Sequence, residues 1–475
     1  MGNRMKNTAN IIGKTALILI VGALLGGLIL TLAFMLPVNQ GNVAATQTIL
    51  DKEGWYPAVP TTAQESGNEE NNYISSFLPG VLDNCTDTLM FRISTNEVKG
   101  NYLYHAMNMY SSFQDFNYSR YWHGYVALLR PLFLLFDYSE IRILNGICQL
   151  SLILFLAYLI GKRKGHAYMF AMLTAYVLLM PMALSLSFQY SWVFYIGMIG
   201  ALIVVSRQDK LQEKQRYLYL FLILGMLTSY MDLLTYPLFT WGFPLIWWVV
   251  MGKKELPAVQ KLLQVVTGGI FWIVGYGGMW VLKWILGGAV LHRNLFASAM
   301  GNVLGWSGVV SDYPGGLGRR LHALSVNWQH YSFNVYVILF LAWLIYFMIV
   351  SIRKGVKANV SVLALLLTGC AGPVWYFLID NHTIEHHFFT YRVYNVTILA
   401  FLICMLEMAG QGEKQKHRIL LWVVALLVGA VSASLIGMGG ESGIRTWLFH
   451  FVTCLAAEMA VGVFILDLPW KKRNR

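Results

Sequence analysis

A polar stretch of the sequence, residues 83–142, carries many of the side chains that could do acid–base or phosphate chemistry. Asp83 and Asp87 are four residues apart, so on a helix they would share one face. A carboxylate placed in this way can accept the proton of an attacking hydroxyl group. The alternative is that one or both carboxylates cap or solvate a helix within a loop.

Four basic residues follow in the same stretch, namely Arg120, His123, Arg130 and Arg142. An arginine can hold a phosphate group through two parallel hydrogen bonds. Arg130 stands in an apolar run, where a buried charge is costly without a partner, so we predict that it contacts an anion. The alternative for the group is ordinary anchoring at a membrane interface, together with the neighbouring aromatic residues.

Two further sites stand at the ends of apolar runs. Asp232 could face a cavity as a second acid or as the partner of an arginine, or it could simply mark a helix end that reaches water. In the segment 380–392, Glu385, His386 and Arg392 are predicted to close over a substrate, with Arg392 at its phosphate. Interfacial anchoring is again the alternative.

The same segment contains a formal H-x-x-E-H pattern, made by His382, Glu385 and His386. Two histidines four residues apart on a helix can bind one metal ion. A zinc peptidase needs a further acidic ligand, and Glu458 would lie roughly 20 Å deep in the membrane at about 1.5 Å per residue. We therefore expect no metal and no cofactor, with a divalent ion at these three residues as the alternative.

The composition indicates what kind of protein holds these side chains. Hydrophobic residues make up 57% of the chain and charged residues 12%, against about 25% charged residues in soluble domains. Mean hydropathy is +0.55, and apolar runs of about 18 residues or more recur, which indicates an integral membrane protein. The net charge of +12 comes from basic connectors between apolar runs, which fits positive-inside topology, so no nucleic-acid partner is expected. The five cysteines form no disulfide framework and no C-x-x-C motif.

The expected fold is all-α, with about twelve transmembrane helices in a single membrane domain, residues 1–475. The Lys and Arg clusters fall on one side of the predicted spans, so both termini are expected in the cytoplasm. Three connectors are predicted on the outer face: a long, partly helical loop at 39–140, a second at 287–331 and a third at 380–392. The predicted spans are residues 15–38, 141–160, 166–185, 187–206, 217–232, 237–251, 262–286, 332–352, 360–379, 393–408, 419–437 and 444–466.

The order of features after the first span resembles the GT-C superfamily of polytopic membrane glycosyltransferases. That family places an acidic residue early in the first outer loop, matched here by Asp83 or Asp87. A charged or His residue before proline follows, and Arg130-Pro131 stands at the matching place, with His123 upstream. An Arg-containing entry to the second span at 139–142 and a basic inner end at 159–163 complete the pattern, which covers about the first 165 residues.

The resemblance implies an enzyme that moves a sugar from a polyprenyl-phosphate carrier to a hydroxyl of a cell-envelope glycan or lipid. An Asp of the first outer loop would act as the base, and arginines would hold the phosphate, at the outer face of a bacterial plasma membrane. A transporter or flippase of lipid-linked sugars is the rival; it should have broken helices in two related halves, and the glycine pairs at 268–269 and 277–278 occur in one half only. A non-catalytic envelope-assembly protein is a third possibility.

Overall fold

The computed structural model describes residues 2–53, 84–109, 118–252, 256–309, 316–330 and 360–409, and every regular element in these ranges is a helix. The expectation of an all-α fold is confirmed for this part of the chain. Asp83 and the predicted spans 332–352, 419–437 and 444–466 lie outside the described residues.

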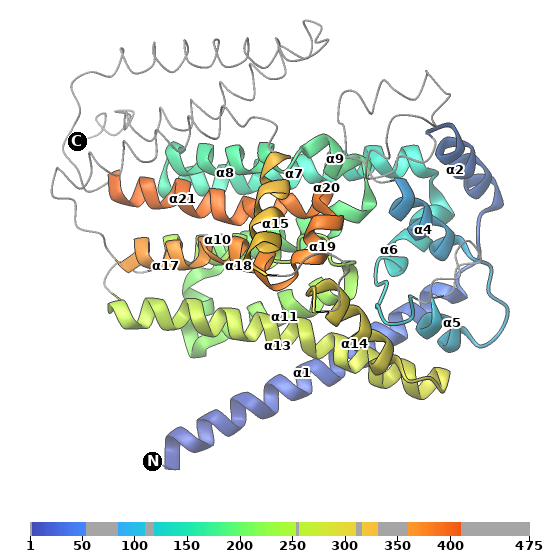
Figure 1. The fold of residues 1–475 in the computed structure, drawn as a ribbon, viewed down its shortest axis with the longest axis horizontal. Helices are drawn as coiled ribbons and strands as arrows, with labels where there is room; N and C mark the ends of the chain where they lie inside the picture. Colours follow the sequence, from blue (N-terminus) through green and yellow to red (C-terminus); the bar gives the residue numbers. More distant parts are fainter. Residues whose placement is uncertain are drawn as a thin grey trace, which may run out of the picture.

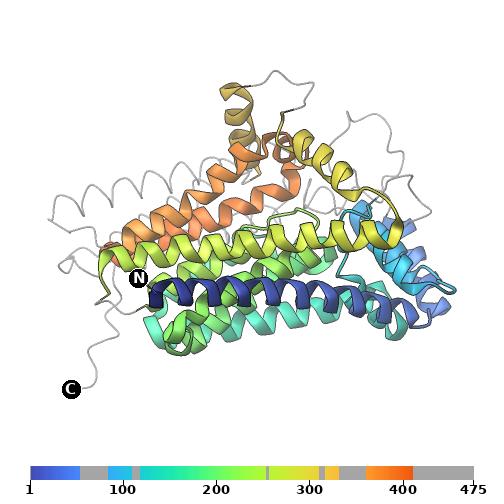
Figure 2. The same ribbon diagram turned by 90° about the horizontal axis from the view of Figure 1, so that it is seen from below.

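Most of the long apolar helices run side by side along the length of the molecule, with α1 crossing them obliquely (Figures 1 and 2). They are α1 (Gly2–Met35), α7 (Tyr138–Lys164), α10 (Phe188–Gln212), α11 (Arg216–Met231), α13 (Ala258–Leu291) and α21 (Tyr394–Ala409), and the short helices α17 (Val360–Gly369) and α18 (Ala371–Leu378) follow each other in one further apolar segment. By length and composition six segments could cross a membrane: Ala9–Met35, Tyr138–Lys164, Phe188–Met231, Val259–Leu291, Val360–Leu378 and His387–Glu407. The chain is thus a candidate multi-pass membrane protein.

Fewer long helices than predicted spans are present among the described residues, because some predicted spans are interrupted, short or joined to the next span. The span predicted at 166–185 is divided into α8 (His166–Leu178) and α9 (Pro181–Leu186), because Met180 takes a φ of 61° just before Pro181. The helix α12 (Phe239–Met251) has only 13 residues. The segment Phe188–Met231 contains two predicted spans, α10 and α11, which are joined at the short turn Glu213–Gln215.

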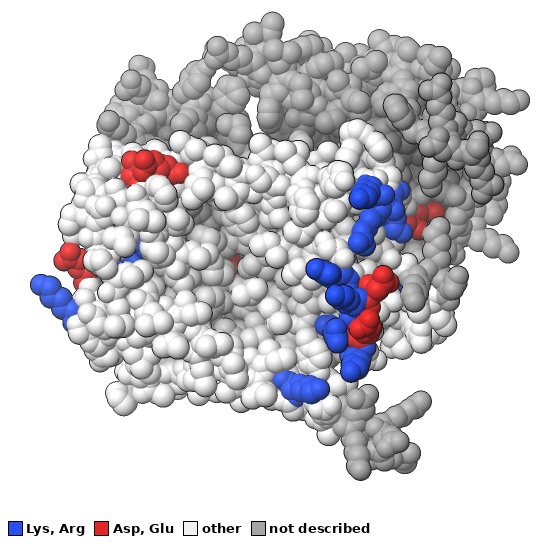
Figure 3. Space-filling view, turned by 180° about the vertical axis from the view of Figure 1, so that it is seen from behind, with Lys and Arg blue, Asp and Glu red and all other residues white. Residues whose placement is uncertain are grey.

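Large apolar side chains cover the outside of these helices. Leu24 on α1 is 56% exposed, Leu154 on α7 56% and Ile273 on α13 63%, whereas soluble monomers rarely show extended apolar surfaces. Figure 3 shows one such face, almost free of charge, with Lys and Arg side chains gathered mainly at one end. The helix ends in that region carry Lys162, Arg163, Lys164, Lys210, Lys214 and Arg216. The basic side chains of these described helix ends therefore lie together, away from the apolar face.

The opposite end of the bundle, at the right of Figure 1, holds the short helices of the predicted first loop. These are α2 (Gln40–Glu53), α4 (Asn84–Thr95), α5 (Tyr102–Asn108) and α6 (Val126–Leu135). They pack with the ends of α1, α7 and α13 in a second hydrophobic core, separate from the core of the helix bundle. The described helices of the first loop therefore form a folded unit packed against the bundle.

Helices α11 and α13 approach each other at the level of their backbones. A Cβ atom on Gly225 would lie 2.1 Å from the carbonyl oxygen of Trp272, and one on Gly275 would lie 2.1 Å from that of Leu222. Only glycine leaves room for this contact, as is common between membrane helices. It fixes the position of α13, whose outer half carries a row of aromatic residues.

The predicted second and third loops form a helical cap on one side of the bundle (Figure 2). The cap contains α14 (Leu295–Trp306), α15 (Leu317–Gln329), α19 (Asp380–Glu385) and α20 (His387–Thr390). Arg319 Nε donates to Asp380 Oδ2 at 2.9 Å, and Asn327 Nδ2 donates to the carbonyl of Thr383 at 2.7 Å. The two loops are therefore held together by buried polar contacts.

Candidate functional site

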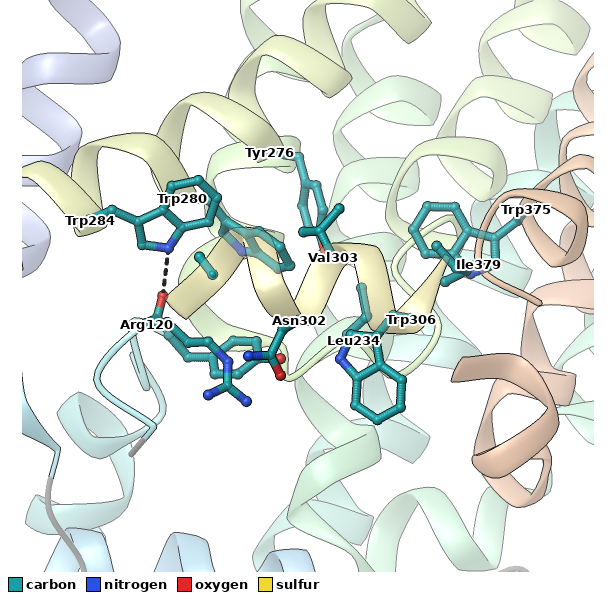
Figure 4. Close-up of a pocket in the computed structure, with 12 residues that line it drawn as sticks. Arg120, Leu234, Tyr276, Trp280, Trp284, Asn302, Val303, Trp306, Trp375 and Ile379 are labelled. Atoms are coloured by element: carbon teal, nitrogen blue, oxygen red, sulfur yellow. Dashed lines mark hydrogen bonds between the residues drawn. The ribbon is translucent and has the colours of Figure 1, made fainter. Parts of the chain in front are cut away.

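A small aromatic pocket, with a volume of about 140 Å³, lies where the first and second predicted outer loops meet the predicted spans (Figure 4). Segment 118–125, α13, α14, the segment after α11 and the end of α18 all contribute to its wall. Its aromatic lining residues are Tyr121, Tyr276, Trp280, Trp284, Trp306 and Trp375. A concave, mostly apolar site with a few polar groups is typical of ligand pockets.

One wall of the pocket is a row of aromatic rings on α13. Trp272, Tyr276, Trp280 and Trp284 stand four residues apart, with successive ring centroids separated by 5.0, 5.3 and 6.0 Å. Trp272 Nε1 anchors the inner end by donating to Thr240 Oγ1 at 2.9 Å. Our sequence analysis missed this wall, although an i, i+4 spacing of aromatic residues places them on one helix face.

Arg120 is the one predicted site residue that lines the pocket, and it is the only charged residue among the described lining residues. Its guanidinium lies 5.4 Å from the ring centroid of Tyr118 and 4.9 Å from that of Tyr121. Trp284 Nε1 donates to the Arg120 carbonyl at 3.1 Å. Figure 4 shows Arg120 beside Asn302, at the end of the pocket away from Trp375.

His123 shapes the segment that presents Arg120. Its Nε2–H donates to the Tyr118 carbonyl at 3.1 Å, so Nδ1 accepts from the Tyr125 hydroxyl at 2.7 Å. Burial lowers the pKa of His123 to about 3, so the ring is neutral. The next residue, Gly124, donates its N–H to the Tyr230 carbonyl at 2.7 Å, and a Cβ there would lie 2.6 Å from that oxygen. The structure thus gives His123 a place in the loop rather than in the pocket.

Asp87 caps helix α10 from α4, about a hundred residues away in the chain. Its Oδ2 accepts from the Phe188 N–H at 2.9 Å and the Tyr138 hydroxyl at 2.7 Å. Its Oδ1 accepts from the Gln189 N–H at 3.1 Å and the Ser187 hydroxyl at 3.0 Å. Four donors fill the acceptor positions of one buried carboxylate at a helix N-terminus, where negative charge is favourable.

Arg142 belongs to the same cluster. Its Nε donates to the Leu186 carbonyl at 2.7 Å and its Nη2 to the Tyr138 hydroxyl at 2.8 Å, while the guanidinium lies 3.9 Å from the Tyr138 ring centroid. Burial raises the pKa of Asp87, whereas the Tyr138 hydroxyl, the Phe188 N–H and the charge of Arg142 each lower it. Because all four contacts to Asp87 are donors, the geometry fits its ionised form.

Arg130 joins two helix ends. Its Nε and Nη2 donate to the Leu36 carbonyl at 3.1 and 2.8 Å, and Nη2 also reaches the Phe34 carbonyl at 3.4 Å. Its Nη1 donates to the carbonyls of Ser94 and Asn96 at 3.1 and 2.8 Å. These carbonyls lie at the C-terminal ends of α1 and α4. The last carbonyl groups of a helix have no N–H donor within that helix. Backbone oxygens therefore supply the acceptors that this buried cation needs.

Asp232 and His382 lie behind the pocket wall formed by Leu234. The Asp232 carboxylate accepts from the Thr235 N–H at 3.1 and 3.0 Å and from the Thr235 hydroxyl, and burial raises its pKa to about 6. His382 Nε2 donates to the Leu234 carbonyl at 2.9 Å, and its ring lies 4.9 Å from that of Trp306. Both residues support the wall without being part of the lining.

His386 packs in an aromatic cluster, stacked on Phe389 at 5.2 Å and 5.3 Å from Trp306, and burial lowers its pKa to about 4. Glu385 is exposed and accepts a long bond of 3.4 Å from Asn381. Within the ranges that the structure describes, no three His, Cys, Asp or Glu side chains are arranged to hold a metal ion, and this includes His382, Glu385 and His386.

Arg392 is buried within the bundle, between the rings of Tyr190 and Tyr391, whose centroids lie 4.1 and 4.7 Å from the guanidinium carbon. Its Nε donates to the Leu179 carbonyl at 3.1 Å, at the break between α8 and α9. Its Nη1 and Nη2 have no hydrogen-bond partner among the described residues. The predicted phosphate ligands thus occupy separate environments, with Arg120 alone in the pocket.

The fold and the site together define a class: an all-α protein with several helices able to span a membrane and an aromatic, arginine-bearing pocket beside its loop regions. No protein-family model matches the chain, and neither the curated proteins nor the solved structures contain a match.

Proposed function

We propose that the protein is a multi-pass membrane glycosyltransferase of the plasma membrane, with both termini in the cytoplasm. It moves a sugar from a polyprenyl-phosphate carrier to a hydroxyl of a cell-envelope glycan or lipid on the outer face. The observation that supports this best is the aromatic pocket with Arg120 at one end, built from residues of the first and second predicted outer loops and of the predicted spans beside them.

The lining has the chemistry that such a donor needs. Aromatic faces carry partial negative charge and pack well against the C–H faces of a sugar ring. Arg120 supplies a cation for the carrier phosphate, which an ordinary apolar pocket would lack. A pocket at the predicted membrane–water boundary lets the phosphate remain near the lipid headgroups while the sugar enters.

Of the two first-loop carboxylates, we assign the role of base to Asp83. Asp87 already accepts four hydrogen bonds and is buried, so it has no free acceptor position for a substrate hydroxyl. Asp83 stands just before α4 in the sequence and lies outside the described residues. Asp83→Asn should therefore lose transfer by on the order of 10²–10⁴ while donor binding is kept.

Binding of undecaprenyl phosphate glucose to the full-length protein in lipid nanodiscs tests the site. Arg120→Gln should raise the Kd roughly tenfold to a hundredfold, because hydrogen bonds to a charged group contribute about 1.5–3 kcal/mol. Arg293→Gln is the matched control, since Arg293 is exposed and bonds only loosely to Asn108, at 3.5 Å. Wild-type protein that does not bind the lipid, or an Arg120→Gln variant that binds it normally, would contradict the proposal.

One observation favours the rival function of a transporter for lipid-linked sugars. The helical segment is interrupted between α8 and α9, and the buried Arg392 donates to a carbonyl at that interruption. Transporters bind charged groups at the ends of discontinuous helices of this kind. In proteoliposomes, a transporter would move undecaprenyl phosphate glucose across the bilayer with its sugar bond intact. A transferase would release undecaprenyl phosphate when an acceptor is supplied.

A further inference from the structure

We propose that the end of the pocket formed by Trp306 and Trp375 selects an uncharged sugar ring. This inference rests on the proposed function and adds to it the chemical class of the transferred group. The supporting feature is a set of buried indole N–H groups, on tryptophans that line the pocket, without hydrogen-bond partners among the described residues.

Three tryptophans of the pocket, Trp280, Trp306 and Trp375, have buried Nε1 atoms with no hydrogen-bond partner among the described residues. Trp284, also in the lining, differs because its Nε1 donates to the Arg120 carbonyl. An indole nitrogen can only donate, and a buried donor without an acceptor is unfavourable. A ligand with hydroxyl or ring oxygens would supply the missing acceptors.

The pocket has two chemically different ends, as Figure 4 shows. Arg120 and Asn302 lie at one end, and Trp306 and Trp375 lie toward the other. Trp306 rests on His382 and His386, whose pKa values are both lowered by burial, so these two rings add no positive charge to this wall at neutral pH. A carrier phosphate at Arg120 would therefore place its sugar at the neutral end.

The neutral end disfavours two other kinds of occupant. A prenyl chain would fill the space but leave the indole N–H groups unsatisfied. A sugar bearing a carboxylate or an ammonium group would lose its hydration where no residue of opposite charge lines the wall, since Arg120 is the only charged residue among the described lining residues. A neutral hexopyranose has oxygen atoms that can accept from the indole N–H groups and carries no charge to be desolvated.

Other tryptophans provide the control. Trp192, Trp241 and Trp247 also have buried indole nitrogens without a partner in the described part of the chain, but they are not among the lining residues. Exchange of Trp for Phe keeps a six-membered aromatic ring and removes the N–H together with the smaller ring that carries it. Trp247→Phe, at a fully buried position, therefore reproduces the chemical change without touching the site.

The experiment compares the affinities of undecaprenyl phosphate glucose and undecaprenyl phosphate for the protein in nanodiscs. Trp306→Phe and Trp375→Phe should each weaken binding of the glucosylated lipid roughly two- to tenfold, the range expected for one hydrogen bond, with little change for undecaprenyl phosphate. Trp247→Phe should change neither. Wild-type protein should bind undecaprenyl phosphate glucuronate at least about tenfold more weakly than the glucose lipid.

The outcomes separate the two proposals. Suppose that the wild type binds undecaprenyl phosphate glucose, and that Trp306→Phe and Trp375→Phe both prefer this lipid over undecaprenyl phosphate as strongly as the wild type does. The inference then fails and the proposed function stands. Equal affinity for the glucuronate and glucose lipids, which needs no variant, also overturns the inference. If the wild type does not bind undecaprenyl phosphate glucose, the proposed function fails and the inference fails with it.

Discussion

Asp87→Asn is the most informative single change, because it separates a structural carboxylate from a catalytic one. The substitution keeps the size of the side chain but replaces one acceptor oxygen by an amide group. The native carboxylate accepts from two hydroxyls and two backbone N–H groups, one of each kind on each oxygen. The consequence can be worked out for both orientations of the new amide.

In either orientation the amide nitrogen faces one hydroxyl and one backbone N–H. The Ser187 or Tyr138 hydroxyl can turn to accept from it, but the N–H of Phe188 or Gln189 is a fixed donor and loses its partner. An unsatisfied buried donor costs about 1–3 kcal/mol, and the remaining bonds weaken by about 1 kcal/mol each once the acceptor is neutral. The expected loss is about 3–5 kcal/mol, a large part of the stability of about 5–15 kcal/mol of a typical domain.

Thermal unfolding in detergent measures this loss, and Asp51→Asn is the control. Asp51 is exposed and accepts only from Gln47, so its change should stay within about 0.5 kcal/mol. Asp87→Asn should lower the melting temperature, while the folded fraction keeps its transfer activity. A variant that melts like the wild type but transfers no sugar would refute the reasoning and make Asp87 the base.

Two further predictions concern buried charges. Asp232 has a folded pKa of about 6, above the usual value of about 3.9, so the stability that its protonated form contributes is present below pH 4 and lost as the pH rises through 6. The stability of Asp232→Asn relative to the wild type should thus be about 2–3 kcal/mol more favourable at pH 7.5 than at pH 4. Melting curves of both proteins at the two pH values check this. Arg130→Lys cannot reproduce contacts to the carbonyls of two helix ends, so it should lower the melting temperature without changing the Kd for undecaprenyl phosphate glucose. A weaker donor Kd with normal melting would return Arg130 to the role of phosphate ligand.

Local patterns predicted the helices well, because their signals lie within a few residues. Apolar runs marked the described helices of the bundle but not the individual helices of the loops, and the start of α7 is fixed by a capping box between Asp137 and Glu140. Helix breaks were harder to foresee: Pro181 is an ordinary residue at the start of α9, yet the span predicted there proved to be two helices.

The roles of charged residues depended on partners distant in the sequence. Arg130 contacts carbonyls 34 to 96 residues away, and the donors to Asp87 from α10 lie about a hundred residues along the chain. No spacing rule identifies a helix end as the partner of a charge so far away. The aromatic row on α13 is an i, i+4 repeat in the sequence, but this spacing occurs on any packed helix face and does not by itself indicate a pocket wall.

The backbone contact between Gly225 and Gly275 has a mechanical consequence for the pocket. Any separation of α11 and α13 would break a close contact along their length, so the aromatic row on α13 forms a fixed wall. The opposite wall, α14, is more exposed, and its end is tied to α19 by Asn381, which donates to the Gly305 carbonyl at 3.2 Å. The two walls therefore differ in how they are held: α13 by a backbone contact along a helix, and α14 by a single described hydrogen bond at its end, which makes α14 the wall that a crosslink to α19 would stiffen.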